Sequence, residues 1–213
     1  MILKKLKTKS SKKLLLFFAG WSMDEHPFLH YEPSDSDFII VYNYDSLDFD
    51  ESLLIGYEEV KVVAWSMGVW AAAQVLANSS LPVVMSIAVN GTLFPVDDKK
   101  GIAVDIFNAT LKNLNEQSLI KFRRRICGSK EVYERFQNNP PRRELTDLKN
   151  ELKKLGELST KLKKPSFNFD RVYVSNRDLA ILTKNQQCAW KDQNVILIDA
   201  PHYPEALFSV LFN

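Results

Sequence analysis

The chain of 213 residues is 46% hydrophobic and carries 28 lysines and arginines against 26 aspartates and glutamates. This length predicts a single domain over residues 1–213 with one substantial core, and it leaves little room for a second domain. The net charge of +2 indicates no particular class of partner, and no apolar stretch is long enough to cross a membrane, so we expect no membrane partner.

The start of the chain, "MILKKLKTKSSKKLLLFFAGW", resembles a secretion signal, but its apolar run is too short and no cleavage site follows. The two cysteines, Cys127 and Cys188, lie far apart without C-x-x-C spacing, which is typical of a reduced intracellular protein with free thiols. These features together predict a cytoplasmic protein.

Six lysines fall within the first thirteen residues, with Ile2, Leu3 and Leu6 among them. This pattern predicts an edge hairpin that turns at Ser10 and Ser11. A nucleic-acid-binding arm is the weaker interpretation, because no aromatic residue is interleaved with these lysines, and we expect no nucleic-acid partner.

Short apolar runs bounded by turn residues predict strands that are buried on both faces. The runs are Leu14–Ala19, Phe38–Tyr42, Val60–Trp65, Val83–Val89, Val172–Ser175 and Val195–Ile198. An alanine-rich stretch, Val69–Ala77, separates the third run from the fourth and predicts a helix packed closely on the sheet. Strand, helix and strand at this spacing indicate a parallel crossover, and therefore an α/β protein with a mostly parallel sheet flanked by helices.

Residues 101–164 predict a helical insertion before the last two strands, because their leucines recur at steps of three and four residues. The stripe runs from Leu145 to Leu162 behind two prolines, and Leu119, Phe122 and Ile126 form another. The insertion carries 15 lysines and arginines against 8 acidic residues, whereas the remainder carries 13 against 18. The basic excess is either a solvated helical face or a docking surface for an acidic partner.

The stretch "VVAWSMGVW" places Ser66 between a predicted strand and a predicted helix. The pentapeptide from Ala64 to Gly68 reads A-x-S-x-G, which differs by one methyl group from the G-x-S-x-G nucleophile elbow. A serine hydroxyl becomes a nucleophile only when a base takes its proton. The alternative interpretation is that Ser66 caps the following helix.

Three histidines are candidates for that base. His202 follows the last predicted strand, so a loop would carry it over the sheet edge on which Ser66 lies. His26 and His30 are spaced for a metal site beside Asp24, but Pro27 interrupts the helix that would align them, and we expect no metal. His202 is therefore the predicted base.

Asp178 directly follows the strand "RVYVS" and is the predicted carboxylate partner of His202. Asp199 stands too close to His202 in sequence, and Asp170 precedes its strand. The order Ser66, Asp178, His202 is the order found in α/β-hydrolases.

Stabilising the developing oxyanion would require backbone donors near Ser66. Met67 would supply one N–H at the start of its helix, and Trp21 would supply a second in the turn after Gly20. The alternative for Trp21 is a core residue in an ordinary turn.

The segments "FFAGWSMD", "AWSMGVWAA", "AVNGT", "FRRRICG", "SNRD" and "APHYP" together resemble the BioG-type pimeloyl-acyl-carrier-protein methyl ester esterases of biotin synthesis, a compact branch of the α/β-hydrolases. The resemblance runs from Leu14 to about Phe208. Two departures are Ala64 in place of the elbow's first glycine and the lack of a histidine before Gly20.

The resemblance implies Ser66 as nucleophile, His202 as base and then acid, Asp178 as orienting carboxylate, and backbone oxyanion donors at Trp21 and Met67. It implies hydrolysis of the methyl ester of pimeloyl-[acyl-carrier protein] to the free carboxylate and methanol, without a cofactor. It also implies that residues 101–164 form a lid that binds acyl carrier protein. The arginines in the comparable positions are Arg123, Arg124, Arg125 and Arg135.

Two other functions remain open from the residues alone. One is a broad-specificity esterase or thioesterase acting on small free substrates, and the other is a non-catalytic binding protein with an α/β-hydrolase fold. The sequence leaves acyl chain length and oligomeric state undecided.

Overall fold

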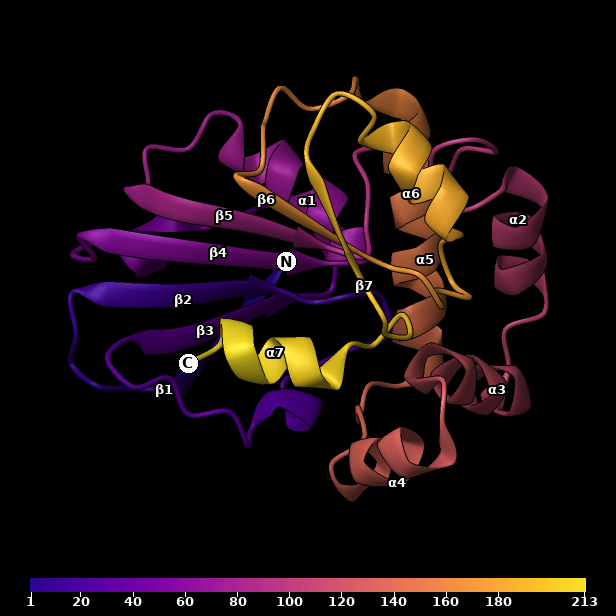
Figure 1. The fold of residues 1–213 in the computed structure, drawn as a ribbon, viewed down its shortest axis with the longest axis horizontal. Helices are drawn as coiled ribbons and strands as arrows, with labels where there is room; N and C mark the ends of the chain where they lie inside the picture. The colour runs from indigo at the N-terminus through magenta and orange to yellow at the C-terminus, as the bar shows by residue number, and fades with distance from the viewer.

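The computed structural model describes residues 1–213, which form seven helices of α type and a single seven-stranded sheet (Figure 1). The strands lie in the order β1-β3-β2-β4-β5-β6-β7, and every neighbouring pair except β1 and β3 is parallel. The prediction of an α/β protein with a mostly parallel sheet is confirmed. The strands are β1 (Ile2–Lys7), β2 (Lys13–Phe18), β3 (Asp37–Tyr42), β4 (Glu59–Trp65), β5 (Val83–Val89), β6 (Arg171–Ser175) and β7 (Val195–Ile198).

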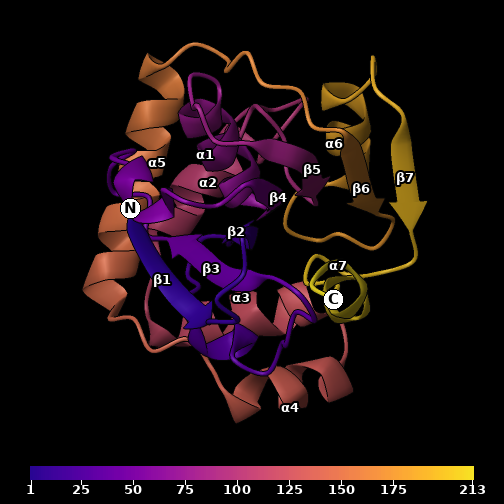
Figure 2. The same cartoon turned by 90° about the vertical axis from the view of Figure 1, so that its left-hand side faces the viewer.

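Helices cover both faces of the sheet, and α1 lies on the side opposite α7 (Figure 2). Alternation along β2 builds the two cores, because successive side chains of a strand point to opposite faces. Leu14 and Leu16 pack on the α1 side, whereas Leu15 and Phe17 pack on the α7 side. The helices are α1 (Met67–Leu76), α2 (Val104–Lys112), α3 (Glu116–Cys127), α4 (Lys130–Asn138), α5 (Leu145–Lys161), α6 (Thr183–Ala189) and α7 (Glu205–Leu211).

The insertion predicted over residues 101–164 comprises α2 to α5, which lie beyond the carboxyl ends of the central strands (Figure 1). The leucine stripe of α5 is buried at Leu148, Leu152 and Leu155, and α3 buries Leu119 and Ile126. These helices therefore cover the edge of the sheet where ligands bind in parallel α/β folds. The role of this segment as a lid, and the treatment of the chain as one domain, stay predictions.

The hairpin predicted for the first residues is wrong. Strand β1 does lie at the edge of the sheet, but it pairs antiparallel with β3 rather than with β2. Both edges of β2 are already taken by β3 and β4 in parallel register. A strand that is buried on both faces and paired on both edges has no place for a hairpin partner, so β1 adds beyond β3.

Strand β7 also differs from its prediction. It was expected to be buried on both faces, but Ile196 is 38% exposed and Leu197 is 55% exposed. An uninterrupted apolar run shows that a segment favours a strand, and it does not show whether that strand is central or lies at the edge.

None of the helices combines the length and the hydropathy needed to cross a bilayer. The two cysteines are free, Cys127 in the core and Cys188 on the surface. The cytoplasmic location stays a prediction.

The carboxylate of Asp37, at the start of β3, joins β1 to the body of the sheet. It accepts hydrogen bonds from Lys5 Nζ at 3.0 Å, from the Lys9 backbone N–H at 2.7 Å and from the Tyr57 hydroxyl at 2.7 Å. Burial alone would raise the pKa of Asp37, but these bonds outweigh it and lower the pKa to about 2. The charged form is therefore the one that stabilises the fold.

A lowered pKa in the folded state means that this stability is complete above about pH 4 and is lost as the pH falls through about 2. We expect Asp37→Asn to lower the free energy of unfolding by about 2 kcal/mol at neutral pH and by much less near pH 2. Urea unfolding at both pH values measures this difference. The exposed Asp35→Asn is the matched control, and an equal loss at both pH values for Asp37→Asn would contradict the assignment.

Candidate active site

Ser66 lies in the sharp turn between β4 and α1, with φ 58° and ψ −127°. This backbone conformation is unfavourable for a residue with a side chain, at a cost of about 1–3 kcal/mol. The turn is held by the bond from Ser66 N–H to the Val89 carbonyl, 3.0 Å. A Cβ at Gly68 would lie 2.4 Å from the Phe18 carbonyl oxygen, so only glycine lets α1 begin this close to β2. The sequence around Ser66 therefore forms a strained elbow.

The Ser66 hydroxyl makes no capping bond to α1, so the helix-cap interpretation is wrong. Its Oγ instead lies 2.9 Å from Nε2 of His202, and Nδ1 of His202 lies 2.7 Å from Oδ2 of Asp178. A carboxylate only accepts hydrogen bonds, so Nδ1 carries the proton and Nε2 is free to accept one from Ser66. Serine, imidazole and carboxylate thus form one continuous chain inside the protein.

The two competing aspartates lie elsewhere. Asp199 is exposed and pairs with Arg177 at 2.9 Å. Asp170 lies at the amino end of β6, where it accepts hydrogen bonds from Ser86.

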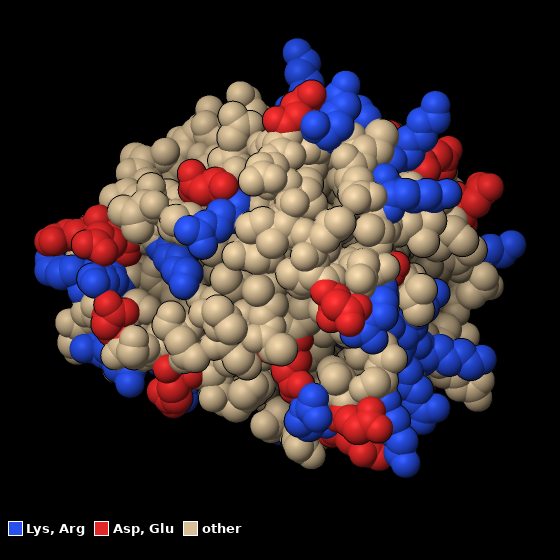
Figure 3. Space-filling model, in the orientation of Figure 1, with Lys and Arg blue, Asp and Glu red and all other residues tan.

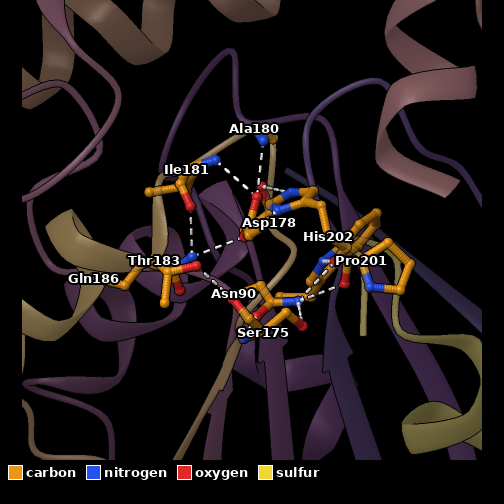
Figure 4. A network of polar contacts seen from close by, with 12 residues as sticks. Asn90, Ser175, Asp178, Ala180, Ile181, Thr183, Gln186, Pro201 and His202 are labelled. Atoms are coloured by element: carbon orange, nitrogen blue, oxygen red, sulfur yellow. Dashed lines mark hydrogen bonds and ion pairs between the residues drawn. The ribbon is translucent and has the colours of Figure 1, made fainter. Parts of the chain in front are cut away.

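His202 is fixed through its own backbone as well as its ring (Figure 4). Its carbonyl oxygen accepts bonds from the Trp65 indole at 2.8 Å and from the Asn90 side-chain amide at 2.9 Å. The same Asn90 amide exchanges two bonds with Ser175 at the end of β6. The loop that carries the imidazole is therefore tied to the ends of β4, β5 and β6.

Asp178 is held by four donors. Its Oδ1 accepts from the backbone N–H groups of Ala180 at 2.8 Å and Ile181 at 2.9 Å. Its Oδ2 accepts from His202 and from the side-chain amide of Gln186, both at 2.7 Å. Four donors fix the orientation of the carboxylate and compensate for its burial.

Both predicted oxyanion donors are buried, and neither the backbone N–H of Trp21 nor that of Met67 bonds to another protein group. A buried backbone N–H without a partner is rare. The Gly20 turn closely approaches the elbow, because a Cβ at Gly20 would lie 3.1 Å from Ser66 Cβ. Two free donors thus flank the serine. The Trp21 indole separately donates to the Leu148 carbonyl on α5 at 2.9 Å, so its side chain also packs as core.

A cleft of about 540 Å³, including its opening to solvent, contains Ser66 and His202. Its lining is mainly apolar, with 10 hydrophobic residues among 14, and this is typical of a small-molecule site. A second hollow continues it toward the surface between α2 and α3. The residues common to both are Trp21, Ile106, Thr110, Phe122 and Arg125.

The four arginines predicted to bind a carrier protein differ in their surroundings. Arg125 alone lines the cleft, while Arg124 lies over the Tyr133 ring. Arg123 is half-buried, and its burial lowers its pKa. Arg135 is paired with Glu205 at 2.6 Å.

The remaining candidate groups lie outside the cleft. Ligand atoms of Asp24, Glu25 and His26 lie within 4.8 Å of one another, but both oxygens of Asp24 already accept backbone N–H bonds. His30 packs against the Tyr31 ring instead of joining this group. Burial raises the pKa of the Cys127 thiol to about 12, which leaves it unreactive.

Sequence reasoning missed the supporting roles of Asn90 and Gln186. Asn90 directly follows β5 at the carboxyl edge of the sheet and has φ 46°, so its position in the chain was a usable signal. Gln186 lies inside a short helix eight residues after Asp178, where nothing in the sequence distinguishes it from Gln187.

Nearly the whole chain matches a known family. A family model described as pimeloyl-ACP methyl esterase BioG matches residues 2–211. The chain belongs to the BioG family. The resemblance predicted from the sequence is thereby confirmed. The crystal structure of BioG from Haemophilus influenzae is similar over 100% of both chains, with 35% identity and a TM-score of 0.91.

A relative of this BioG chain is named malonyl-[acyl-carrier protein] O-methyltransferase in Bacteroides fragilis, with 48% identity over 198 residues. The match covers 92% of this chain and 40% of that protein, so the chain spans less than half of the relative's length. A lipase-esterase related protein from Clostridium acetobutylicum is similar in structure, with a TM-score of 0.64, 14% identity and coverage of 99% and 96%. The last likeness establishes the α/β-hydrolase fold.

Proposed function

We propose that this BioG chain is a serine carboxylesterase whose nucleophile is Ser66. The observation that carries the proposal is the continuous hydrogen-bonded chain from Ser66 through His202 to Asp178 beside two unpaired backbone N–H groups. Nucleophile, base, orienting acid and oxyanion donors are the parts that acyl transfer requires.

In the proposed reaction, Ser66 Oγ attacks the ester carbonyl while Nε2 of His202 takes its proton. The N–H groups of Trp21 and Met67 stabilise the negative oxygen of the tetrahedral intermediate. His202 then gives the proton to the departing methoxide, which leaves as methanol, and an acyl ester remains on Ser66. A water molecule, activated by His202, attacks this ester and releases the carboxylic acid.

The proposed substrate is the methyl ester of pimeloyl-[acyl-carrier protein], in the synthesis of biotin. The family description names this esterase activity, and the Bacteroides relative is named for a methyl transfer to a carrier-bound diacid. The triad and the two unpaired backbone N–H groups suit attack on an acyl carbon, so removal of the methyl group fits these residues better than its addition.

The shape and charge of the α2–α5 segment support a carrier-bound substrate. The apolar cleft suits an acyl chain with its ester at Ser66, and the hollow between α2 and α3 offers the attached arm a route to the surface. Lysine and arginine side chains gather over α3 and α4 at the lower right of Figure 3. We propose that this segment is a lid and that its basic surface binds acyl carrier protein, with Arg125 at the mouth of the cleft.

The test compares the carrier-bound pimeloyl methyl ester with the same ester on free pantetheine. Raising the ionic strength should lower kcat/KM for the carrier-bound ester and leave the neutral free ester unchanged, because salt screens the docking charges. Arg125→Glu should lower kcat/KM for the carrier-bound ester by about tenfold.

Arg171→Glu is the matched control, since it makes the same charge change at the amino end of β6, away from the lid. Equal rates on both esters, insensitive to salt, would replace this proposal with a broad-specificity esterase.

A further inference from the structure

We propose that Gln186 is a positioning residue of the esterase site, which fixes the Asp178 carboxylate and limits how strongly that carboxylate stabilises the protonated form of His202. This inference rests on the proposed esterase function. Gln186 has no hydrogen bond to Ser66 and does not line the cleft, so its role would be exerted through Asp178.

The orientation of the Gln186 amide follows from the chemistry of its neighbours (Figure 4). Its nitrogen lies 2.7 Å from Oδ2 of Asp178 and 2.7 Å from the Ile181 carbonyl oxygen. Both neighbours accept hydrogen bonds and neither can donate, so only the NH₂ end of the amide can face them. Gln186 therefore donates to the catalytic carboxylate.

This arrangement has a cost that packing alone does not explain. Gln186 is completely buried, and its Oε1 has no hydrogen-bond partner. An apolar side chain of the same length would fill the space without an unsatisfied oxygen, and a buried polar atom without a partner is destabilising. The placement points to a role for the donated bond itself.

The Gln186 amide donates to the same carboxylate oxygen of Asp178 that His202 contacts. Oδ2 of Asp178 accepts from Gln186 and from Nδ1 of His202, so the two donors share the negative charge of one atom. On its other sides the imidazole meets Ser66 and the Trp65 ring, and Arg125 lines the same cleft from α3. Asp178 is thus the anionic group in contact with the imidazole, and its charge decides how firmly His202 holds a second proton.

Helix α6 holds Gln186 in place. Asn185 donates to the carbonyl oxygens of Asp98 and Gly101 at 3.1 and 2.9 Å, and Thr183 Oγ1 donates to the Ser175 carbonyl at 2.7 Å. These bonds anchor α6 to the end of β6 and to the segment that leads into the lid. These contacts therefore hold the Gln186 donor beside Asp178.

The experiment measures the pH dependence of Ser66 labelling by a fluorophosphonate probe and of kcat and KM on a soluble methyl ester. Gln186→Met keeps the length of the side chain and removes the donor. We expect the acidic limb of both profiles to move upward by about 0.5–1 pH unit, because Asp178 then stabilises the imidazolium more strongly. We expect kcat to fall about tenfold with KM unchanged, because the carboxylate is less firmly oriented. The neighbouring, exposed Gln187→Met is the control and should match the wild type.

A second variant, Gln186→Glu, keeps the size of the side chain and serves if the methionine variant does not fold. Two facing carboxylates cannot both ionise readily, so at low pH the introduced carboxyl group should keep its proton and donate a hydrogen bond to Asp178. At alkaline pH it should ionise and activity should be lost, where the wild type keeps its plateau. Wild-type pH profiles for either folded variant would overturn the inference. A wild-type protein whose Ser66 is neither labelled nor required for hydrolysis would instead overturn the proposed function.

Discussion

Ser66→Ala should lower kcat for ester hydrolysis by about 10⁴- to 10⁶-fold, while the melting temperature stays close to that of the wild type. The reason is that the Ser66 hydroxyl is the proposed atom of attack, and its single hydrogen bond to a side chain joins it to His202 at 2.9 Å. Steady-state hydrolysis of a chromogenic short-chain ester and thermal unfolding measure the two effects.

Ser80→Ala is the matched control, because this serine is exposed and lies after α1, far from the elbow. The control should keep full activity and full labelling by the fluorophosphonate probe. Retained turnover in Ser66→Ala would reject this residue as the nucleophile.

The largest expected effect on stability comes from the ion pair between Arg143 and Glu151. Their side chains are 8% and 0% exposed, with Nη1 and Oε2 separated by 2.6 Å. Glu151 also accepts from the Tyr44 N–H at 3.0 Å, and Arg143 donates to the carbonyl of Met23, which follows the turn at Gly20 and Trp21. The pair therefore joins α5, the end of β3 and the segment after that turn.

Glu151→Leu should lower the free energy of unfolding by about 3–5 kcal/mol, because it leaves a buried guanidinium without a counter-charge. Arg143→Met should lower the free energy of unfolding by less than Glu151→Leu does. Complete burial already raises the pKa of Glu151, so the carboxyl group can take up a proton when the arginine is absent, whereas an arginine cannot lose one. Urea unfolding at neutral pH measures both variants.

Two controls distinguish the loss of the Arg143–Glu151 ion pair from a general destabilisation of α5. Glu157→Ala breaks exposed pairs on the same helix and should change the free energy of unfolding by less than about 1 kcal/mol. The double variant Arg143→Met with Glu151→Leu should regain most of the free energy of unfolding that Glu151→Leu loses on its own. A Glu151→Leu protein as stable as the wild type would contradict the structural role of the pair.

The elements of the sheet were predictable because central parallel strands are apolar on both faces. The run that became β2 is uninterrupted and the run that became β4 is broken only by Lys61, and their ends placed Ser66 and Trp21 at one edge. The same rule brought Asp178 and His202 to that edge, since each follows a strand at its carboxyl end. Chain order and strand direction were enough to predict which side chains the structure brings together, and their catalytic roles remain proposals.

The pairing of edge strands and the contacts between buried polar side chains could not be predicted from the sequence. The pairing of β1 with β3 depends on which edges remain free after the centre is filled, and a single strand does not encode that. The contact of Gln186 with Asp178 depends on how α6 is anchored to residues far away in the chain. The same holds for Arg143 and Glu151, because eight residues span about 12 Å along a helix and this spacing does not predict a direct contact.

The central claim is that the carrier-bound methyl ester is hydrolysed by attack at its acyl carbon, so that the bond between this carbon and the methoxy oxygen breaks. Its most direct test is hydrolysis of the methyl ester of pimeloyl-[acyl-carrier protein] in water enriched in heavy oxygen, followed by mass spectrometry of both products. Water attacks the acyl carbon in the proposed mechanism, so the label should enter the new carboxylate and be absent from the methanol. Label in the methanol, or a methyl ester that stays intact with active, folded protein, would contradict the account.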